Sequence, residues 1–295
     1  MFFALPKISL FCIALTLICT YVPVNANSVN ITPSTPSIEF TATSKKRAIV
    51  IGASSGMGHE IAKILLKEGY TVGVTARRIQ PLEELKATYG DNVITQQMDI
   101  ANIESALQQL NGLIEQLGGL DLCILAATGY REMDWQSSDW KTYLHFLNTD
   151  IIAFTALSKT IINFFESQKS GHFVGFSSVS GYRGDGKDAV YCAAKSYATR
   201  FLEGERNRLM QNNIPVFVTE LVPGWVPTSA DQKEPKPYMY WVDSVEEAGQ
   251  AIWKAIQNKK SVGYITERQE SVVKLIQSIP ENLYNALNAR PGGML

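Results

Sequence analysis

The chain has 295 residues, 45% of them hydrophobic, with 27 basic and 28 acidic residues and a formal net charge of −1. This suits one large globular domain or two small ones, and it excludes collagen-like, low-complexity and disordered chains and a chain-wide basic surface for nucleic acid. Four cysteines are too few for a disulfide scaffold, and only Cys123 and Cys192 lie outside the N-terminal leader. Neither these cysteines nor the three histidines follow metal-ligand spacing, so we expect no metal and interpret the histidines as structural.

The N-terminus has the layout of a targeting segment. Residues 1–26 contain one charge, Lys7, followed by an apolar run and a small-residue pattern at 24–26, as in a secretory signal peptide. An uncleaved N-terminal anchor is the alternative, although the run is shorter than the ~20 residues of a spanning helix. Residues 27–44, rich in Ser, Thr, Pro and Asn, predict a linker. Two locations stay open: a secreted or periplasmic one, or a membrane anchor with the folded part facing the cytoplasm.

Short apolar strands then alternate with amphipathic helices. In chain order we expect a strand at 48–51, a helix around 61–66, a strand at 71–75, a helix at 81–89, a strand at 93–98, a helix at 103–117, a strand at 120–125, a helix at 139–167, a strand at 172–176, a helix at 191–211, a strand at 216–221, a helix at 245–257 and a strand at 262–265. This alternation predicts an α/β fold: a single domain, residues 45–268, with a Rossmann-like doubly wound parallel sheet of about seven strands. Residues 269–295 predict a C-terminal helical extension broken at Pro280.

A glycine-rich loop follows the first predicted strand, and it reads Gly52-Ala53-Ser54-Ser55-Gly56-Met57-Gly58. Its glycines allow a tight turn, close approach of the backbone to a phosphate and close helix packing. Amides at the start of the following helix, aided by the helix dipole, would face a pyrophosphate. We therefore expect a dinucleotide here, with an ordinary structural turn as the alternative.

The end of the second predicted strand bears on which dinucleotide is bound. Enzymes that use NAD place a carboxylate there for the ribose 2′-hydroxyl, whereas residues 74–78 contain none. The Arg77 guanidinium suits a 2′-phosphate, so NADP(H) is favoured over NAD(H). For Arg78 we expect a solvated loop charge.

Tyr191 and Lys195 stand four residues apart in a predicted helix, a spacing that places both on one face. A free phenol has a pKa of about 10, and a nearby ammonium lowers it. Tyr191 could then exchange a proton with a substrate oxygen. The pair alone is a weak signal, because this spacing is common by chance.

These features together resemble the short-chain dehydrogenase/reductase family over residues 46–266. The motifs that carry the resemblance are the glycine loop, Asp99, Asn148, Ser178, Tyr191-Cys192-Ala193-Ala194-Lys195, and Pro223-Gly224 followed by Thr228. The resemblance implies a nicotinamide cofactor and hydride transfer between that cofactor and a carbonyl carbon.

The resemblance also implies roles for single residues. Ser178, thirteen residues before Tyr191, would hydrogen-bond the substrate carbonyl, with Ser177 and Ser180 as the rival serines. Lys195 would lower the pKa of Tyr191 and contact the ribose. Asn148 would disturb its helix and hold a water that passes protons to the lysine.

Further positions are carried over by the same resemblance. Asp99 would lie beside the adenine ring, although an N-cap for the next helix is the alternative. The backbone at Pro223-Gly224 and Thr228 would touch the carboxamide and a nearby phosphate. The expected cofactor contacts are Gly52, Ser54, Ser55, Gly56, Met57, Gly58, Arg77, Asp99, Tyr191, Lys195, Pro223, Gly224 and Thr228, and the expected catalytic residues are Tyr191, Lys195, Ser178 and Asn148.

One loop departs from the family pattern. After the fourth strand many members have Asn-Asn-Ala-Gly, and this chain has Ala126-Ala127-Thr128-Gly129. We still expect cofactor binding, and we interpret the chain as an NADP(H)-dependent oxidoreductase that interconverts a carbonyl and a secondary alcohol.

Two alternatives stay open: a membrane-linked reductase of keto-lipids or steroids, suggested by the leader and the aromatic, Pro-rich segment 225–243, and a non-catalytic dinucleotide sensor. The expected partner is a small-molecule or lipid-like carbonyl substrate. No nucleic acid is expected, while homo-oligomerisation and membrane association through the leader stay open.

Overall fold

The computed structural model describes residues 45–129, 139–186, 188–226, 244–265 and 267–289. Within these residues seven parallel strands form one sheet in the order β3-β2-β1-β4-β5-β6-β7. The strands are β1 (Arg47–Ile51), β2 (Thr71–Ala76), β3 (Val93–Gln97), β4 (Leu122–Leu125), β5 (His172–Phe176), β6 (Phe217–Val222) and β7 (Val262–Tyr264). The predicted doubly wound, Rossmann-like sheet is confirmed.

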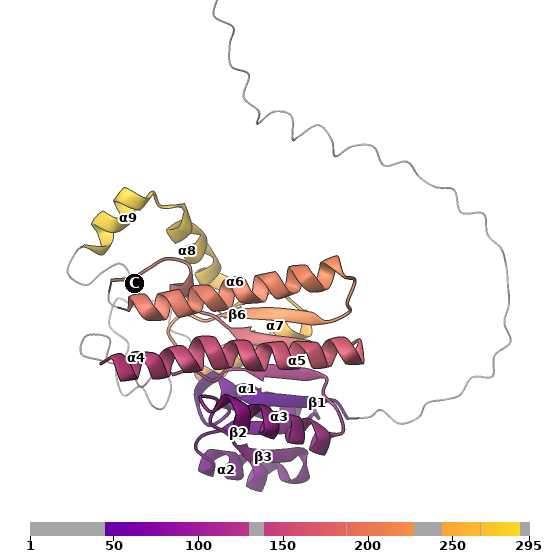
Figure 1. Cartoon of the computed structure of the whole chain (residues 1–295). Helices are drawn as coiled ribbons and strands as arrows, with labels where there is room; N and C mark the ends of the chain where they lie inside the picture. Colours follow the sequence, from indigo (N-terminus) through magenta and orange to yellow (C-terminus); the bar gives the residue numbers. More distant parts are fainter. Residues whose placement is uncertain (1–44, 130–138, 187, 227–243, 266, 290–295) are drawn as a thin grey trace, which may run out of the picture. The chain divides into compact units, whose positions relative to one another are not determined.

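Helices connect successive strands and cover both faces of the sheet (Figure 1). They are α1 (Gly56–Lys67), α2 (Gln80–Tyr89), α3 (Ile103–Leu117), α4 (Trp140–Leu147), α5 (Phe154–Gln168), α6 (Ala189–Gln211), α7 (Val245–Gln257), α8 (Glu267–Ser278) and α9 (Glu281–Asn288). Buried side chains of α1, α2 and α7 form one hydrophobic cluster with the sheet, and those of α3, α5 and α6 form the other. Because both faces are covered, β4 is apolar along its whole length and β1 is apolar after Arg47, rather than alternating.

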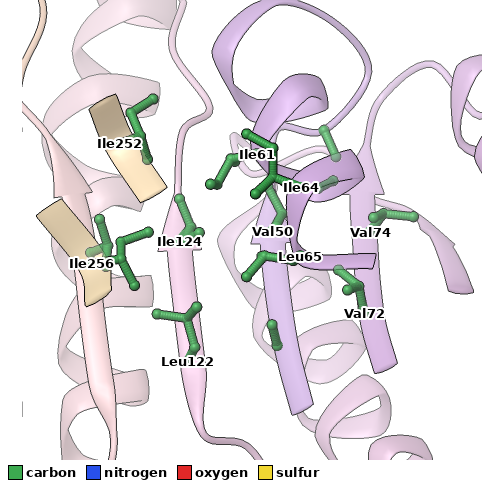
Figure 2. Close-up of a cluster of buried hydrophobic side chains, with 14 of the residues drawn as sticks. Val50, Ile61, Ile64, Leu65, Val72, Val74, Leu122, Ile124, Ile252 and Ile256 are labelled. Atoms are coloured by element: carbon green, nitrogen blue, oxygen red, sulfur yellow. The ribbon is translucent and has the colours of Figure 1, made fainter. Parts of the chain in front are cut away.

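The packing of α1 and α7 explains why the glycine loop is held firmly. Figure 2 shows Ile61 and Leu65 of α1 beside Val50 of β1, and Ile252 of α7 near Ile124 of β4. All five side chains are fully buried. Burying each of them stabilises the fold by about 1.5–3 kcal/mol, so the strand and helix on either side of the loop are fixed.

The strand order reverses between β1 and β4, which are neighbours in the sheet. The connections from β1 and β4 therefore leave in opposite directions and open a crevice at the carboxyl ends of these strands. In doubly wound sheets this is where ligands bind.

The predicted helical stretch over 139–167 is confirmed, although it is not one regular α-helix. The chain forms α4, then a π-helical turn at Asn148–Ala153 (η4), then α5. A π-turn holds more residues per turn than an α-helix and is frequent at functional sites. The predicted break at Pro280 is confirmed, since α8 ends and α9 begins on either side of it.

Several predictions lie outside the described residues. These are the signal peptide or anchor (1–26), the linker (27–44), Thr228 and most of the aromatic segment 225–243. Among the helices that the structure does describe, none is long and apolar enough to cross a membrane.

Candidate active site

A cleft of about 550 Å³ lies at the carboxyl ends of the central strands. The glycine loop, the ends of β2 and β3 and the loop after β4 form its walls. The expected cofactor residues that line it are Gly52, Ser54, Ser55, Gly56, Met57, Gly58, Arg77 and Asp99. These eight residues follow three different strands, β1, β2 and β3, and the fold brings them together in one cleft.

The glycine loop passes closer to its neighbours than any side chain would allow. Gly52 has φ +97°, and a Cβ on it would lie 2.6 Å from the amide nitrogen of Ala127. A Cβ on Gly58 would lie 2.3 Å from the carbonyl oxygen of Gly52. The first turn of α1 contains no acidic residue, so its amides and the helix dipole are not opposed there. These features fit the diphosphate of a dinucleotide.

Both arginines after β2 line the cleft. Arg78 Nη2 donates to Ser54 Oγ at 3.2 Å and to Ser55 Oγ at 3.1 Å. Arg78 is exposed, in agreement with the prediction of a solvated charge, and its guanidinium also contacts the glycine loop. Two guanidinium groups and no carboxylate at this end of β2 suit a ribose that carries a phosphate.

Asp99 also lines the cleft, and its Oδ1 accepts from the amide of Ala101 at 3.0 Å. The N-cap of α3 is Asn102, whose side chain accepts from the amide of Ser105. The N-cap interpretation of Asp99 is wrong, and its position in the cleft agrees with a contact to the cofactor.

Tyr191 and Lys195 lie on the same face of α6, as their spacing predicts. Lys195 Nζ is 5.6 Å from the centroid of the Tyr191 ring, and a hydrogen bond joins Tyr191 to Ser178. Ser178 precedes a short 3₁₀ turn, Val179–Gly181, and its Oγ accepts from the amide of Ser180 at 3.2 Å. The structure therefore brings the predicted tyrosine, lysine and serine together.

The pKa of Tyr191 differs from the sequence expectation. Burial raises the pKa of Tyr191, while the Lys195 charge and the Ser178 hydrogen bond lower it. Asp150 and Asp188 raise it further, and the net shift is upward from the usual value of 10.0. Lys195 opposes the rise, as predicted, without reversing it.

Glu220 decides between the candidate serines. Its carboxylate is 1% exposed and accepts from Ser177 Oγ at 2.6 Å and from Thr199 Oγ1 at 2.8 Å. Arg206 Nη2 lies 3.8 Å from the other carboxylate oxygen. Ser177 is thus turned into a buried polar cluster beneath the site, which leaves Ser178 facing Tyr191.

The helix that contains Asn148 is disturbed, as the family resemblance implies, because the π-turn begins at this residue. The side chain in contact with Lys195 is however Asp150, whose Oδ1 lies 3.0 Å from Lys195 Nζ. Asp150 was missed from the sequence. The available signal was a lone charge within an apolar helical stretch.

The histidines divide into two kinds. His59 Nδ1 contacts the carbonyl oxygen of Ala53 at 3.1 Å, and buried His172 contacts Thr219 Oγ1 at 2.7 Å, so both are structural as predicted. His145 lines the cleft. No group of three or more His, Cys, Asp or Glu side chains in the described part of the chain could hold a metal ion.

The turn after β6 is tied to both neighbouring segments. The carbonyl of Pro223 accepts from the amide of Val179 at 3.0 Å, next to Ser178. The amide of Gly224 donates to Gln269 Oε1 of α8 at 3.0 Å. Pro223-Gly224 therefore lies beside the segment of Ser178 and contacts α8.

The last two helices also hold the loop between Ser178 and Tyr191. Arg183 donates to the carbonyl of Ile279, and the Tyr284 hydroxyl of α9 donates to the carbonyl of Gly184 at 3.0 Å. The Arg183 guanidinium lies 4.1 Å from the centroid of the Tyr284 ring.

A family model described as short chain dehydrogenase matches residues 46–238. The chain belongs to this family. The matched region contains the glycine loop, Ser178, Tyr191 and Lys195, so the cleft and the catalytic candidates belong to the part shared with the short-chain dehydrogenases. Membership makes the chain an oxidoreductase that uses a nicotinamide dinucleotide.

Curated relatives of this short-chain dehydrogenase match most of its length. An uncharacterized oxidoreductase of Myxococcus xanthus is 29% identical over 215 residues, 71% of this chain and 84% of that protein. Hydroxysteroid 11-beta-dehydrogenase 1-like protein B of Xenopus laevis is 28% identical over 235 residues, 75% of this chain and 78% of that protein.

Solved structures of low sequence identity share the fold. A short-chain dehydrogenase from Burkholderia cenocepacia in complex with NADP has a TM-score of 0.69 and 20% identity, covering 84% of this chain and 98% of its own. One from Burkholderia phymatum in complex with NAD has a TM-score of 0.68 and 18% identity, covering 85% and 98%. The two neighbours thus bind different nicotinamide dinucleotides.

Proposed function

We propose that this short-chain dehydrogenase interconverts a carbonyl and a secondary alcohol with NADP(H), and that Tyr191 is its acid and base. The observation that carries the proposal is the group of three side chains at one place: Tyr191 hydrogen-bonded to Ser178, with the Lys195 ammonium close to the ring. These groups come from two segments that β6 and its turn hold together.

Each residue has a separate task in this reaction. Tyr191 donates a proton to the carbonyl oxygen during reduction and removes one from the alcohol during oxidation. Ser178 orients the carbonyl by a hydrogen bond that strengthens as negative charge develops on oxygen. Lys195 stabilises the phenolate that remains. The bound nicotinamide supplies or accepts the hydride.

The preference for NADP(H) rests on the end of β2. Arg77 and Arg78 line the cleft there, and Arg78 is positioned by Ser54 and Ser55. A carboxylate would repel a 2′-phosphate, whereas guanidinium groups attract it and bind it in a bidentate manner.

The test compares the wild-type protein with Tyr191→Phe. NADPH absorbance is followed against a panel of ketones, quinones, sugars and steroids, and NADPH binding is measured separately. Removing the proton donor should cost about 10²- to 10⁴-fold in turnover and leave NADPH affinity unchanged. Equal turnover by both proteins would refute the role of Tyr191. NADPH binding without turnover across the panel would instead favour the dinucleotide sensor.

A steroid or keto-lipid is the favoured substrate class within this function. The observation behind it is the Xenopus relative, which is named after a hydroxysteroid dehydrogenase and matches 75% of this chain. Turnover confined to the steroid and long-chain keto members of the panel would support this class, and turnover confined to small ketones would exclude it.

A further inference from the structure

Asp150 is the most deeply buried carboxylate that contacts the candidate catalytic group. It is 4% exposed and receives three donors. Its Oδ1 accepts from Lys195 Nζ at 3.0 Å and from Thr128 Oγ1 at 2.7 Å, and its Oδ2 accepts from the amide of Gly129 at 2.7 Å. A carboxylate with this many donors is fixed in position.

The π-turn brings Asp150 into this position. Since η4 holds more residues per turn than the helices on either side, the side chains after Leu147 are rotated relative to those of a continuous α-helix. Thr149 and Thr155 donate their hydroxyls to carbonyls of the same segment, those of His145 and Ile151. The turn is therefore supported locally, and its buried acidic residue points at α6.

We propose that Asp150 is a positioning residue that pairs with Lys195, ties it to the loop after β4, and keeps Tyr191 in its protonated, proton-donating form. This rests on the proposed function, because it concerns the group that donates the proton. The protonated phenol is the form from which reduction of a carbonyl begins, so the site is prepared for a carbonyl substrate.

Burial is the largest cause of the raised pKa of Tyr191, and nearby charges modify it. Among the described residues these charges are Lys195 of α6, Asp150 of the π-turn and Asp188 before α6. Lys195 alone would stabilise the phenolate strongly in a buried site. The adjacent carboxylate offsets that positive charge, so less stabilisation reaches the phenolate.

Asp150 also fixes the charge of Lys195 itself. Burial lowers the pKa of Lys195, but attraction to Asp150 and Tyr191 outweighs this, and the net shift is upward. The lysine thus stays an ammonium and remains in place, while its net influence on the phenol is reduced. Both effects follow from one ion pair.

The same carboxylate accounts for the altered loop after β4. Thr128 and Gly129 stand where many family members have Ala-Gly, and both donate to Asp150. Ala126 and Ala127 line the cleft without polar side chains. Asp150 of the π-turn thus stabilises the loop after β4 through these hydrogen bonds.

The experiment measures the ionisation of Tyr191 directly and requires no substrate. Tyrosinate absorbance is titrated with pH in the wild-type protein and in Tyr191→Phe, and the difference isolates Tyr191. The same pair is prepared with Asp150→Asn. Removing the negative charge should lower the Tyr191 midpoint, because the Lys195 ammonium then acts on the phenolate without an adjacent carboxylate. An unchanged or higher midpoint would overturn the proposal.

Two further variants separate charge from structure. Thr128→Val removes a donor from the same carboxylate without changing any charge, and it should leave the midpoint where it is. Asp150→Ser also removes the negative charge and should lower the midpoint as Asp150→Asn does, which keeps the test available if the amide variant folds poorly. A shift in Thr128→Val equal to that in Asp150→Asn would overturn the electrostatic role.

These experiments distinguish failure of the inference about Asp150 from failure of the proposed function. If Tyr191→Phe retains full turnover, the proposed function fails whatever the titration shows. If Tyr191→Phe is inactive and the Asp150 variants titrate as the wild type does, only the inference about Asp150 fails.

Discussion

The buried cluster beneath Ser178 gives the sharpest prediction for stability. Glu220 and Arg206 are an ion pair with side chains 1% and 13% exposed. Nη1 of Arg206 is buried and has no hydrogen-bond partner among the described residues. Glu220→Leu leaves this guanidinium without its counter-charge, and Ser177 and Thr199 lose the acceptor for their hydroxyls.

The size of the effect follows from these contacts. Removing one partner of a buried ion pair costs about 3–5 kcal/mol of unfolding free energy, because the other charge stays buried. Glu220→Gln retains the shape and an acceptor oxygen, so it should cost less, about 1–2 kcal/mol. The double variant Glu220→Leu with Arg206→Met removes both charges and replaces them with apolar side chains of similar size. It should recover at least half of the loss.

Urea unfolding of the four proteins, monitored by circular dichroism, measures these differences. A double variant less stable than Glu220→Leu alone would refute the idea that the unpaired guanidinium is the main cost. A cost below about 1 kcal/mol for Glu220→Leu would show that water reaches Arg206 and that the pair is not buried in solution.

The remaining predictions concern cofactor preference and acid stability. Arg77→Ala and Arg78→Ala should each raise KM for NADPH at least tenfold while changing KM for NADH little, and equal increases for both cofactors would contradict a phosphate contact. Burial lowers the pKa of His172 from 6.5 to about 4, so native His172 stays neutral. Its contribution to the free energy of unfolding is complete above pH 6.5 and declines as pH falls toward 4, by up to about 3 kcal/mol. The unfolding free energy can be measured in urea at a series of pH values. Between pH 6.5 and 4 it should fall less in His172→Gln than in the wild-type protein, and an equal fall in both would contradict this role.

The architecture was predictable because its signals are local and repeated. Each strand is an apolar run between turn residues, and the predicted strands and observed strands differ by only one or two residues at their ends. The glycine loop was equally clear, since both Gly52 and Gly58 occupy places where a Cβ would collide with backbone atoms. A position that only glycine can occupy is therefore visible in the sequence.

The polar interior was much less predictable. The π-turn at 148–153 has no periodic signature of its own, because the helices before and after it continue the same apolar pattern. Asp150 and Glu220 acquire their roles from partners 45 and 21 residues away, Lys195 and Thr199 respectively. The contacts of Arg78 with Ser54 and Ser55 were equally invisible in the sequence, since these partners lie on another loop.

Helices α8 and α9 contribute no residue to either of the two large hydrophobic clusters, and they lie beyond the matched family region. They nevertheless touch the backbone of Gly224 and Gly184, on two sides of the catalytic candidates. A substitution in these two helices can therefore shift the backbone around Ser178 and Tyr191 while both large clusters stay intact.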